Sequence, residues 1–302
     1  MNVPEITIVG SANLDLVVDV DHVPLVGETV LGGDLHRIPG GKGANQAVAA
    51  ARLGRRVAMV GRVGDDEGAT ILRAALEHDG IDTTALVTTS GSPNGVALIA
   101  VQADGDNAIV VSPGANARLG ADDIDAAGSL VAEAAVVLLQ LEVPVEAVGA
   151  AARAAGGTVI LNPAPAPVSA LPDDLVDEVD VLVPNQTELA LLTGFDGDVD
   201  VEIATRLARS LPVSAVVVTL GADGAMVVTA SEAVHVPAPT VAPVDTTAAG
   251  DSFCAALADG LVRGETLVDA TRWAVRVGAA TTLRRGAQPS LPTPDEVDRL
   301  LR

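Results

Sequence analysis

The feature that most constrains the fold is an alternation of two kinds of apolar segment along the chain. Short runs rich in Val, Ile and Leu alternate with Ala-rich amphipathic stretches of helical period. We expect strands at 6–9, 57–60, 136–139, 158–161, 181–183, 216–219 and 225–229. We expect helices at 43–53, 67–79, 145–155, 188–192 and 201–210, and from 250 to 283 with a break near Gly264. The alternation predicts an α/β fold, with helices on both faces of a mainly parallel sheet.

Two stretches, 16–38 and 95–111, break this alternation. Both consist of strand-like segments punctuated by Gly, Asp and Pro, and neither contains a helical stretch. We expect them to form a small sheet outside the main one. Because no linker or internal repeat divides the 302 residues, we expect one domain over 1–302, with these stretches as a small β sub-domain.

The charge balance argues against several classes of partner. The chain has 18 Lys and Arg against 40 Asp and Glu, a net charge of −22, and only two Phe, one Trp and no Tyr. A nucleic-acid-binding surface needs basic residues for phosphates and aromatic rings for base stacking. Hydrophobic residues reach 49%, but no run approaches the ~18 uninterrupted apolar residues of a membrane span. We therefore expect neither nucleic acid nor membrane as a partner.

Cysteine usage and the first residues indicate a compartment. The chain has one Cys, and its start, MNVPEITIVG, lacks a cationic region and leads directly into a strand-like segment. A reducing environment is typical of such a chain, and we expect it to be cytoplasmic. The four His are scattered and show no zinc-site spacing with the single Cys.

A glycine-rich loop, PGGKGANQ at 39–46, opens the first expected helix. It is not a Walker A loop, because His36 and Gly43 stand where that motif needs Gly and Ser or Thr, and it lacks the third glycine of the dinucleotide fingerprint. Two interpretations remain open. The loop is either a tight turn that packs a helix on a sheet, or a place where backbone N–H groups, Lys42 and Asn45 approach a ligand closely.

Polar residues follow three of the expected strands, at the edge where open α/β sheets place their ligands. Asn13 and Asp15 come after the first strand, Glu142 after the strand at 136–139, and Asn185 with Glu188 after the strand at 181–183. Asn and Asp side by side can exchange hydrogen bonds with vicinal hydroxyls, although an Asx turn would use the same residues. The pattern favours one cleft suited to a polyol.

The segment DTTAAGDSF at 245–253 is the most informative one. Small residues precede a helix, so the N–H groups of Ala248, Ala249, Gly250 and Asp251 lie at the positive end of its dipole with open access. Such a nest can stabilise charge on a transferring phosphoryl group. Asp251 is interpreted either as a helix cap or as a base that takes a proton from an attacking hydroxyl, and the two roles can coexist.

A glycine-containing turn, TLGADG at 219–224, joins two expected strands. Its glycines would let a nucleotide lie against the backbone, but an ordinary hairpin turn explains them equally well.

Together these segments resemble the ribokinase family of carbohydrate kinases, also called the PfkB type, over essentially the whole chain and in the family's motif order. The motifs that carry the resemblance are Asn13/Asp15, GGKGANQAVAA at 40–50, NPAPA at 162–166, 185–188, 219–224, VDTTAAGDSF at 244–253 and GAQPS at 286–290. The resemblance implies a three-layer α/β/α fold with a small β-sheet lid.

The resemblance also implies roles for individual residues. The implied sugar-binding residues are Asn13, Asp15, Gly41, Lys42, Gly43, Asn45, Glu142 and Asp251. The implied ATP-binding residues are Asn185, Thr219, Gly221, Gly224, Gly250 and Val275. The catalytic base falls on Asp251, with an anion hole at Ala248, Ala249 and Gly250. Val275 stands where a polar residue often lies near adenine, so the resemblance implies an aliphatic adenine pocket.

Two cations are implied as well. Glu188 lies in the segment that the family ties to Mg²⁺, through water, and a monovalent activator, usually K⁺, binds beside the anion hole. The implied K⁺ residues are Asp245, Thr247, Thr281, Arg284, Gly286 and Ser290.

The implied reaction is transfer of the γ-phosphoryl group of ATP to O5 of D-ribose, giving D-ribose 5-phosphate and ADP in ribose catabolism. In this family the lids of two chains pair, so we expect a homodimer. Two alternatives stay open: a kinase of the same fold for deoxyribose, a ketohexose or a nucleoside, and a non-catalytic sugar or nucleotide sensor. The second alternative predicts loss of the base or the anion hole, and both are present in the sequence.

Overall fold

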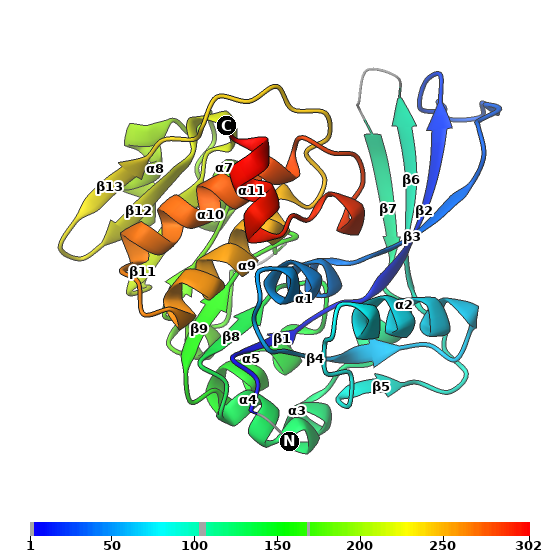
Figure 1. Cartoon of the computed structure of the whole chain (residues 1–302), viewed down its shortest axis with the longest axis horizontal. Coiled ribbons are helices and arrows are strands. Elements are labelled where there is room, and N and C mark those ends of the chain that lie inside the picture. Colours follow the sequence, from blue (N-terminus) through cyan, green and yellow to red (C-terminus); the bar gives the residue numbers. More distant parts are fainter. Residues whose placement is uncertain (1–2, 103–106, 168–169) are drawn as a thin grey trace.

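The computed structural model describes residues 3–102, 107–167 and 170–302, and the following concerns those residues. They form a nine-stranded sheet, the main sheet, between two layers of helices, and a four-stranded sheet, the small sheet, that stands to one side (Figure 1). This arrangement confirms the predicted α/β/α fold with a separate small sheet.

The main sheet is mostly parallel. Its strand order is β13-β12-β11-β10-β9-β8-β1-β4-β5, and only β12 and β13 add antiparallel pairs within the described part of the chain. The strands are β1 Ile6–Val9, β4 Val57–Val63, β5 Leu86–Thr88, β8 Val136–Leu139, β9 Thr158–Leu161, β10 Val181–Leu182, β11 Ala215–Thr219, β12 Ala225–Thr229 and β13 Ala233–Val236.

Two apolar cores form because strand side chains alternate between the faces of the sheet. Ile6 and Ile8 of β1 pack into one core, and Val9 packs into the other. The helices of the first core are α1 Lys42–Arg52, α2 Glu67–His78, α9 Ala249–Val262, α10 Leu267–Thr281 and α11 Pro294–Leu300. Those of the second are α3 Ala121–Ala127, α4 Ser129–Ala132, α5 Val145–Ala154, α6 Asp173–Val176, α7 Gln186–Thr193 and α8 Val201–Ala208.

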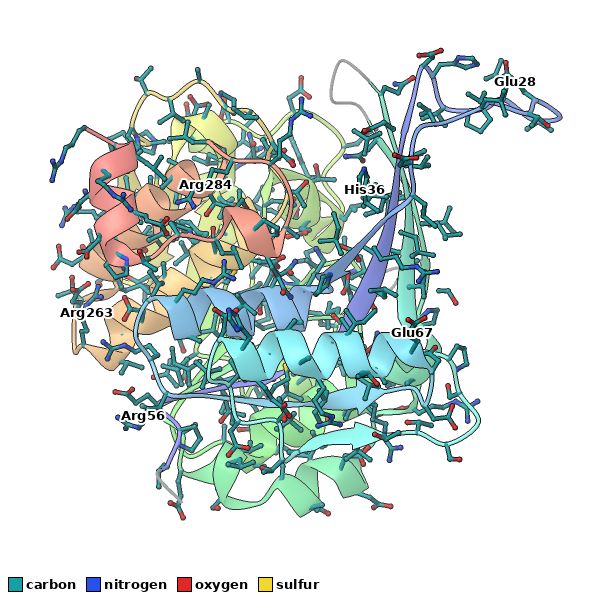
Figure 2. All side chains as sticks on the ribbon, turned by 45° about the vertical axis from the view of Figure 1, so that its right-hand side comes forward. Glu28, His36, Arg56, Glu67, Arg263 and Arg284 are labelled. Carbon is teal, nitrogen blue, oxygen red and sulfur yellow. The ribbon has the colours of Figure 1, made fainter. Side chains whose placement is uncertain are left out.

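The small sheet has the order β3-β2-β6-β7, from β2 Asn13–Val20, β3 His36–Gly40, β6 Gly95–Gln102 and β7 Asn107–Ser112. It confirms the sheet expected from 16–38 and 95–111, of which 103–106 lie outside the described residues. The strands extend beyond the expected bounds at 13, 40 and 112, and no strand is found between β2 and β3, where Pro24 and several glycines interrupt the pattern. Figure 2 shows Glu28, in this connection, far from the helical layers.

The expected strands and long helices are all present within a few residues of the predicted bounds. The elements that the alternation did not predict are β5, β13, α3, α4, α6, α11 and the 3₁₀ turns η1 Gly114–Arg118, η2 Gly221–Asp223 and η3 Gln288–Ser290. Most are too short for a periodic pattern to develop.

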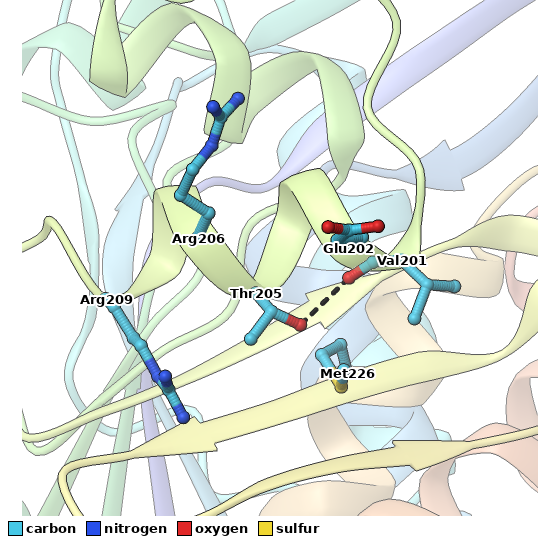
Figure 3. A pocket seen from close by; sticks show the side chains of 6 residues that line it. All are labelled: Val201, Glu202, Thr205, Arg206, Arg209 and Met226. Carbon is cyan, nitrogen blue, oxygen red and sulfur yellow. Dashed lines mark hydrogen bonds between the residues drawn. The ribbon is translucent and has the colours of Figure 1, made fainter.

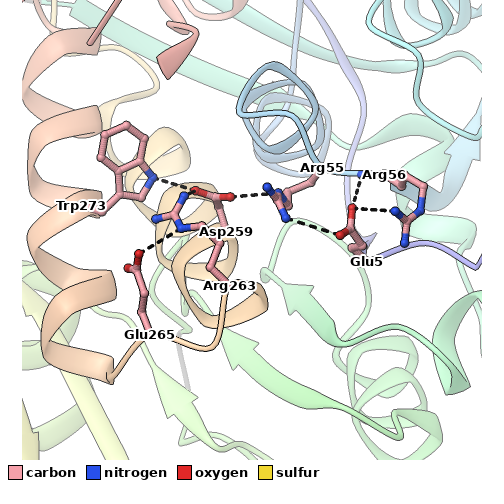
Figure 4. A network of polar contacts seen from close by, with 7 residues as sticks. All are labelled: Glu5, Arg55, Arg56, Asp259, Arg263, Glu265 and Trp273. Carbon is pink, nitrogen blue, oxygen red and sulfur yellow. Dashed lines mark hydrogen bonds and ion pairs between the residues drawn. The ribbon is translucent and has the colours of Figure 1, made fainter. Parts of the chain in front are cut away.

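A buried ion network fixes the second half of α9 (Figure 4). Asp259, fully buried, accepts a hydrogen bond from Trp273 Nε1 at 2.8 Å and pairs with Arg263. Arg55 Nε lies 3.0 Å from Asp259 Oδ1, and Arg55 also pairs with Glu5. The network therefore joins α9 and α10 to the turn between α1 and β4.

No helix in the described ranges is long and apolar enough to cross a membrane.

Candidate active site

The polar residues predicted at the strand ends converge where the N-termini of α1 and α9 meet the carboxyl edge of the main sheet. A cavity of about 240 Å³ lies there. Its lining residues are Lys42, Asn162, Ala164, Val183, Asn185, Glu188, Thr219, Thr246, Ala248, Gly250, Asp251 and Cys254. The cavity thus brings together residues from both the implied sugar site and the implied nucleotide site.

A second, larger hollow of about 570 Å³ lies between α8 and β12 and shares no residue with this cavity (Figure 3). Arg206 and Arg209, which line it, extend in opposite directions, and Thr205 Oγ1 is engaged with the carbonyl of Val201 at 2.8 Å. Its polar groups do not converge, so the chemistry belongs to the smaller cavity.

Glu142 organises the sugar side of the site. Its Oε2 accepts hydrogen bonds from Ser11 Oγ at 2.6 Å, from Asn13 Nδ2 at 3.4 Å and from the backbone N–H of Lys42 at 3.1 Å. Three predicted residues, Asn13, Lys42 and Glu142, are therefore in contact, although they lie on β2, α1 and the segment after β8.

Asp15 lies two residues along β2 from Asn13 and is 9% exposed. Burial, reinforced by the carboxylates of Glu142 and Asp251, raises the pKa of Asp15 to about 7. A carboxyl group with this pKa can either donate or accept a hydrogen bond near neutral pH, as a sugar hydroxyl requires.

The glycines of the loop at 39–46 have a packing role. A Cβ on Gly40 would lie 2.1 Å from Asp15 Oδ2, and a Cβ on Gly41, whose φ is +88°, would lie 2.7 Å from the backbone N of Asn13. A Cβ on Gly43 would lie 2.7 Å from the backbone after β1. The close approach is thus to the protein's own chain, and the polar side chains of the loop remain as the candidates for ligand contact.

Lys42 is the only lysine in the sequence and lies in the cavity. Burial lowers the pKa of Lys42, but the carboxylates of Asp251, Glu142 and Glu188 outweigh it, and the pKa is raised overall. The cavity therefore holds a positive charge at neutral pH between the sugar side and the nucleotide side.

The start of α9 has the geometry of an anion-binding nest. Ala248 has a left-handed backbone, with φ 59°, and is the only non-glycine residue of positive φ among those described. The N–H of Ala249 donates to the carbonyl of Thr246, but those of Gly250 and Asp251 have no acceptor within the described chain. Free N–H groups at a helix start attract a phosphate.

Asp251 is not a helix cap, so that interpretation is wrong. Its carboxylate, 7% exposed, instead accepts from Asn45 Nδ2 at 3.0 Å and from Gln46 Nε2 at 3.3 Å, both on α1. Burial raises the pKa of Asp251, while Lys42 and the two amide donors oppose the rise. A buried carboxylate beside free N–H groups and a lysine can take a proton from a hydroxyl next to a bound phosphate.

The nucleotide side is formed at the ends of β10 and β11. Asn185 caps α7: its Oδ1 accepts from the N–H of Glu188 at 2.8 Å, and Glu188 Oε2 accepts from the N–H of Asn185 at 2.9 Å. Asn185 also bridges to Thr219. Burial raises the pKa of Glu188, although the hydrogen bond from the N–H of Asn185 and the charge of Lys42 lower it. Asn185, Glu188 and Thr219 line the cavity, and their contact with a nucleotide stays a prediction.

The turn at 219–224 is a tight hairpin between β11 and β12, with Gly221 at φ 58° and Gly224 at φ 92°. A Cβ on Gly224 would lie 2.0 Å from the carbonyl O of Val236. The hairpin interpretation is therefore confirmed, and a nucleotide contact stays a prediction. Val275 is 5% exposed, packs in the first core and does not line the cavity.

Three of the implied K⁺ residues lie together. Thr247 Oγ1 donates a hydrogen bond to Asp245 Oδ1 at 2.6 Å. The backbone N–H of Gly286 donates to the other oxygen, Asp245 Oδ2, at 2.7 Å. Burial raises the pKa of Asp245, but these donors outweigh it and lower the pKa overall. Thr281 is tied to Ser252 Oγ at 2.8 Å, beside the start of α9.

The other two implied K⁺ side chains are engaged elsewhere. Ser290 Oγ donates to the carbonyl of Ala287 at 2.8 Å, and Arg284 pairs with Glu296 at 3.1 Å. No group of three or more His, Cys, Asp and Glu with metal-binding geometry occurs in the described part of the chain.

Sequence reasoning did not single out some residues that contact the site. Gln46 contacts Asp251, and Asn116 on η1 donates to Asn13 Oδ1 at 2.7 Å and accepts from the N–H of Ala12. Gln46 lies within the GGKGANQ motif, which could have found it. Asn116 carries no local signal, because its partners lie more than a hundred residues away.

Comparisons with known proteins agree with this geometry. Residues 3–294 match the family described as pfkB family carbohydrate kinase. The chain is 40% identical over 304 residues to the ribokinase of Bacillus subtilis, which covers 98% of this chain and 99% of that protein. It is 37% identical over 302 residues to the deoxyribokinase of Salmonella typhimurium, with 98% of each covered.

The fold also matches a solved structure, that of Arabidopsis thaliana ribokinase complexed with ribose and ATP. The TM-score is 0.88 at 32% sequence identity, and the match covers 100% of this chain and 99% of the other.

Proposed function

The chain belongs to the PfkB family of carbohydrate kinases, and from this premise we propose that it transfers the γ-phosphoryl group of ATP to O5 of D-ribose, giving D-ribose 5-phosphate and ADP. It is an enzyme, a phosphotransferase with an alcohol acceptor. The ribokinase of B. subtilis, similar over nearly the full length of both chains, supports ribose as the acceptor.

The observation that carries the proposal is the position of Asp251. Its carboxylate lies in one cavity with the N-terminus of α9 and with Lys42, and it is held by neutral amides. Asp251 would take the proton of the 5-hydroxyl as that oxygen attacks phosphorus. Lys42 and the N–H groups of Gly250 and Asp251 would stabilise the negative charge of the transferring group.

The remaining hydroxyls of the sugar fit the polar groups around Glu142. We assign their recognition to Asn13, Asp15, Asn45 and Glu142, with backbone contacts from 41–43. Asn45 Oδ1 is buried and has no hydrogen-bond partner among the described residues, so a donor such as a hydroxyl would satisfy it. The adjacent Asp15 and Asn13 suit a pair of vicinal hydroxyls.

The nucleotide is assigned to the opposite side of the cavity. Asn185, Thr219 and Gly250 line it there. Gly221 faces open space and leaves the hairpin after β11 accessible to a flat base, and Gly224 is assigned to the nucleotide through its backbone. Val275 contributes to the aliphatic core beneath this region, in keeping with an adenine pocket without aromatic rings.

Mg²⁺ is the divalent cation proposed to accompany ATP. Glu188 fits this group, because its buried carboxylate lines the cavity beside Asn185 and oxygen ligands suit Mg²⁺, which usually keeps several waters. The ion, when bound, neutralises charge on the phosphates. Glu188 therefore serves to hold water molecules of the ion's shell toward the cavity.

K⁺ is the proposed monovalent activator, held near Asp245, Thr247, Thr281, Arg284, Gly286 and Ser290. The residues fit in part: Asp245 and Thr247 present oxygens beside Gly286, whereas the Arg284 side chain is paired with Glu296. Replacing K⁺ with a large organic cation is expected to lower kcat, and an unchanged rate would remove this site.

The chain is proposed to form a single kinase domain in which the small sheet acts as a lid. The same sheet is proposed to form the interface between the two chains of a homodimer. It begins at the sugar residue Asn13, and its exposed apolar side chains include Leu98, Ile109 and Val110, at 50%, 54% and 64% exposure. A lid closed over the sugar would exclude water, which competes as phosphoryl acceptor. Sedimentation of the purified chain tests the dimer.

The single Cys favours a cytoplasmic location.

Deoxyribose is the second candidate acceptor, supported by the deoxyribokinase relative. The deciding experiment is a coupled ADP-release assay over D-ribose, 2-deoxy-D-ribose, D-fructose and adenosine. We expect ribose to have the highest kcat/KM, because Asp15 and Asn13 would hold a 2-hydroxyl that deoxyribose lacks. If another acceptor exceeds ribose tenfold, the assignment to ribose is wrong and the kinase assignment stands.

A further inference from the structure

A chain of buried side-chain amides lies beside Asp251, and of its three members Asn162 lines the cavity. Gln46 on α1 and Gln140, directly after β8, are fully buried, and Asn162, directly after β9, is 9% exposed. We propose that Gln46, braced by Gln140 and Asn162, is a positioning residue that fixes the carboxylate of the catalytic base. This inference rests on the proposed role of Asp251.

The direction of each hydrogen bond follows from the carboxylate, which only accepts when ionised. Asp251 Oδ1 accepts from Gln46 Nε2 at 3.3 Å, so Gln46 must present Oε1 on its other side. Gln140 Nε2 donates to that Oε1 at 2.5 Å and lies 3.4 Å from the carbonyl O of Leu138. The orientation of Gln46 is thus fixed from both ends.

A second branch holds the same amide group. Gln46 Nε2 also donates to Asn162 Oδ1 at 3.4 Å, and Asn162 Nδ2 donates to the carbonyl O of Val183 at 2.9 Å. The two branches end on backbone carbonyls, at Leu138 within β8 and at Val183 directly after β10. The backbone of the main sheet and of its carboxyl edge therefore determines where Gln46 Nε2 points.

Gln46 differs from its neighbour Asn45, which contacts the other oxygen of Asp251 at 3.0 Å. Asn45 Oδ1 has no partner among the described residues and is assigned to the sugar, whereas both polar atoms of Gln46 are engaged by protein groups. Gln46 is not among the residues that line the cavity. Its contacts with the site are Asp251 and Asn162, and of these two only Asp251 has a proposed role in the reaction.

Amides suit this task because they carry no charge. A lysine or arginine in place of Gln46 would hold the carboxylate more tightly, but it would also stabilise the ionised form and weaken the base. A neutral donor at 3.3 Å restricts rotation of the carboxylate and lowers its pKa less than a cation in the same place would.

The test is the pH dependence of kcat/KM for Gln46→Met, which keeps the length and removes both polar atoms. Loss of a donor to the ionised carboxylate is expected to move the acid limb upward by about one pH unit. We expect kcat at the optimum to fall about tenfold. KM for the sugar should stay within about threefold, because Gln46 does not reach the cavity.

Gln140→Met is the second variant and keeps the test decisive if Gln46→Met does not fold. It removes the brace and leaves the donor, so we expect the same changes at about half the size. Thr271→Val is the matched control, because Thr271 is fully buried and donates only within α10, at 2.7 Å to Leu267 O. It should leave the pH profile unchanged.

An unmoved acid limb and a kcat within twofold of wild type in a folded Gln46 or Gln140 variant would overturn the proposal. A change confined to KM would also overturn it. The profile is measured with whichever sugar the wild-type enzyme turns over best. Failure of ribose as substrate is therefore distinguishable from failure of the positioning role.

Discussion

Helix α9 carries two buried aspartates about two turns apart, and their surroundings are opposite. Asp259 is enclosed by the guanidinium groups of Arg55 and Arg263 and by the indole N–H of Trp273 (Figure 4). Within the described ranges, Asp251 receives hydrogen bonds only from side-chain amides, and Lys42 acts on it through its charge without a hydrogen bond. One helix thus holds one carboxylate that contacts two cations and a second carboxylate whose hydrogen-bond donors are neutral amides.

The difference separates stabilisation from reactivity. Burial raises the pKa of Asp259 too, but Arg55, Arg263 and Trp273 hold both of its oxygens, and breaking such a pair leaves buried charge behind. Burial likewise raises the pKa of Asp251 against Lys42 and the amide donors, and no guanidinium group occupies its oxygens among the described residues. The first arrangement anchors the far end of α9, and the second suits a base at its N-terminus.

The largest expected effect is that of Asp251→Asn on turnover. The amide keeps the shape and cannot accept a proton, so we expect kcat to fall about 10³-fold. The free energy of unfolding should stay within about 1 kcal/mol of wild type, because the variant removes a buried carboxylate of raised pKa. ADP release and urea denaturation measure the two. A loss of only a few-fold in kcat would rule out Asp251 as the base.

Asp259→Asn is expected to reverse this pattern. Removing the charge leaves Arg55 and Arg263 with Glu5 and Glu265 as remaining partners, and we expect the free energy of unfolding to fall by about 3 kcal/mol. With the protein folded, kcat should stay within twofold. Asp269→Asn, at an exposed pair with Arg272, is the control and should behave like wild type. A thousandfold loss of kcat in Asp259→Asn would abolish the distinction between the two aspartates.

The two aspartates also show what the sequence could predict. Asp251 lies in DTTAAGDSF, where small residues before a helix are a local signal, and its place in the site was predictable. Asp259 lies in an apolar helix with no such signal, because Arg55 is two hundred residues away and Trp273 is on the next helix. Contacts over long sequence separation are determined by packing, which a local motif does not encode.

The same limit applies to the fold and the loop. Most strands of the main sheet could be predicted because each lies in a buried, continuous apolar run, whereas β5 and β13, at the two edges of that sheet, are partly exposed. The glycines at 40, 41 and 43 suggested close approach, but only the structure shows that the approach is to Asp15 and to the backbone before β2. Asn116 gave no signal at all.

Asp15 extends the comparison to a third buried carboxylate, whose proton affinity no cation in the described part of the chain offsets. Burial, Glu142 and Asp251 all raise its pKa, to about 7. The folded state therefore holds a proton at pH 5 that the unfolded chain has released, and this stability is lost as pH rises through 7. Between pH 5 and 8, wild type should lose about 2.5 kcal/mol of unfolding free energy relative to Asp15→Asn. Urea denaturation at both pH values checks this. Parallel curves would mean that Asp15 titrates normally.

The smallest effect concerns the backbone at the reactive end of α9. The backbone of Ala248 is left-handed, which costs an L-residue about 1–2 kcal/mol. Ala248→Gly removes this strain from the folded state. Glycine also gives the unfolded chain more conformational freedom, which cancels part of the gain in stability. We expect a gain of about 0.5 kcal/mol. Ala249→Gly, one position later and helical, is the matched variant and should lose about 1 kcal/mol. Equal destabilisation by both, measured by urea denaturation, would show that no strain is stored at Ala248. Opposite signs would show that the reactive end of α9 is held in a conformation its own sequence disfavours, unlike the end anchored at Asp259.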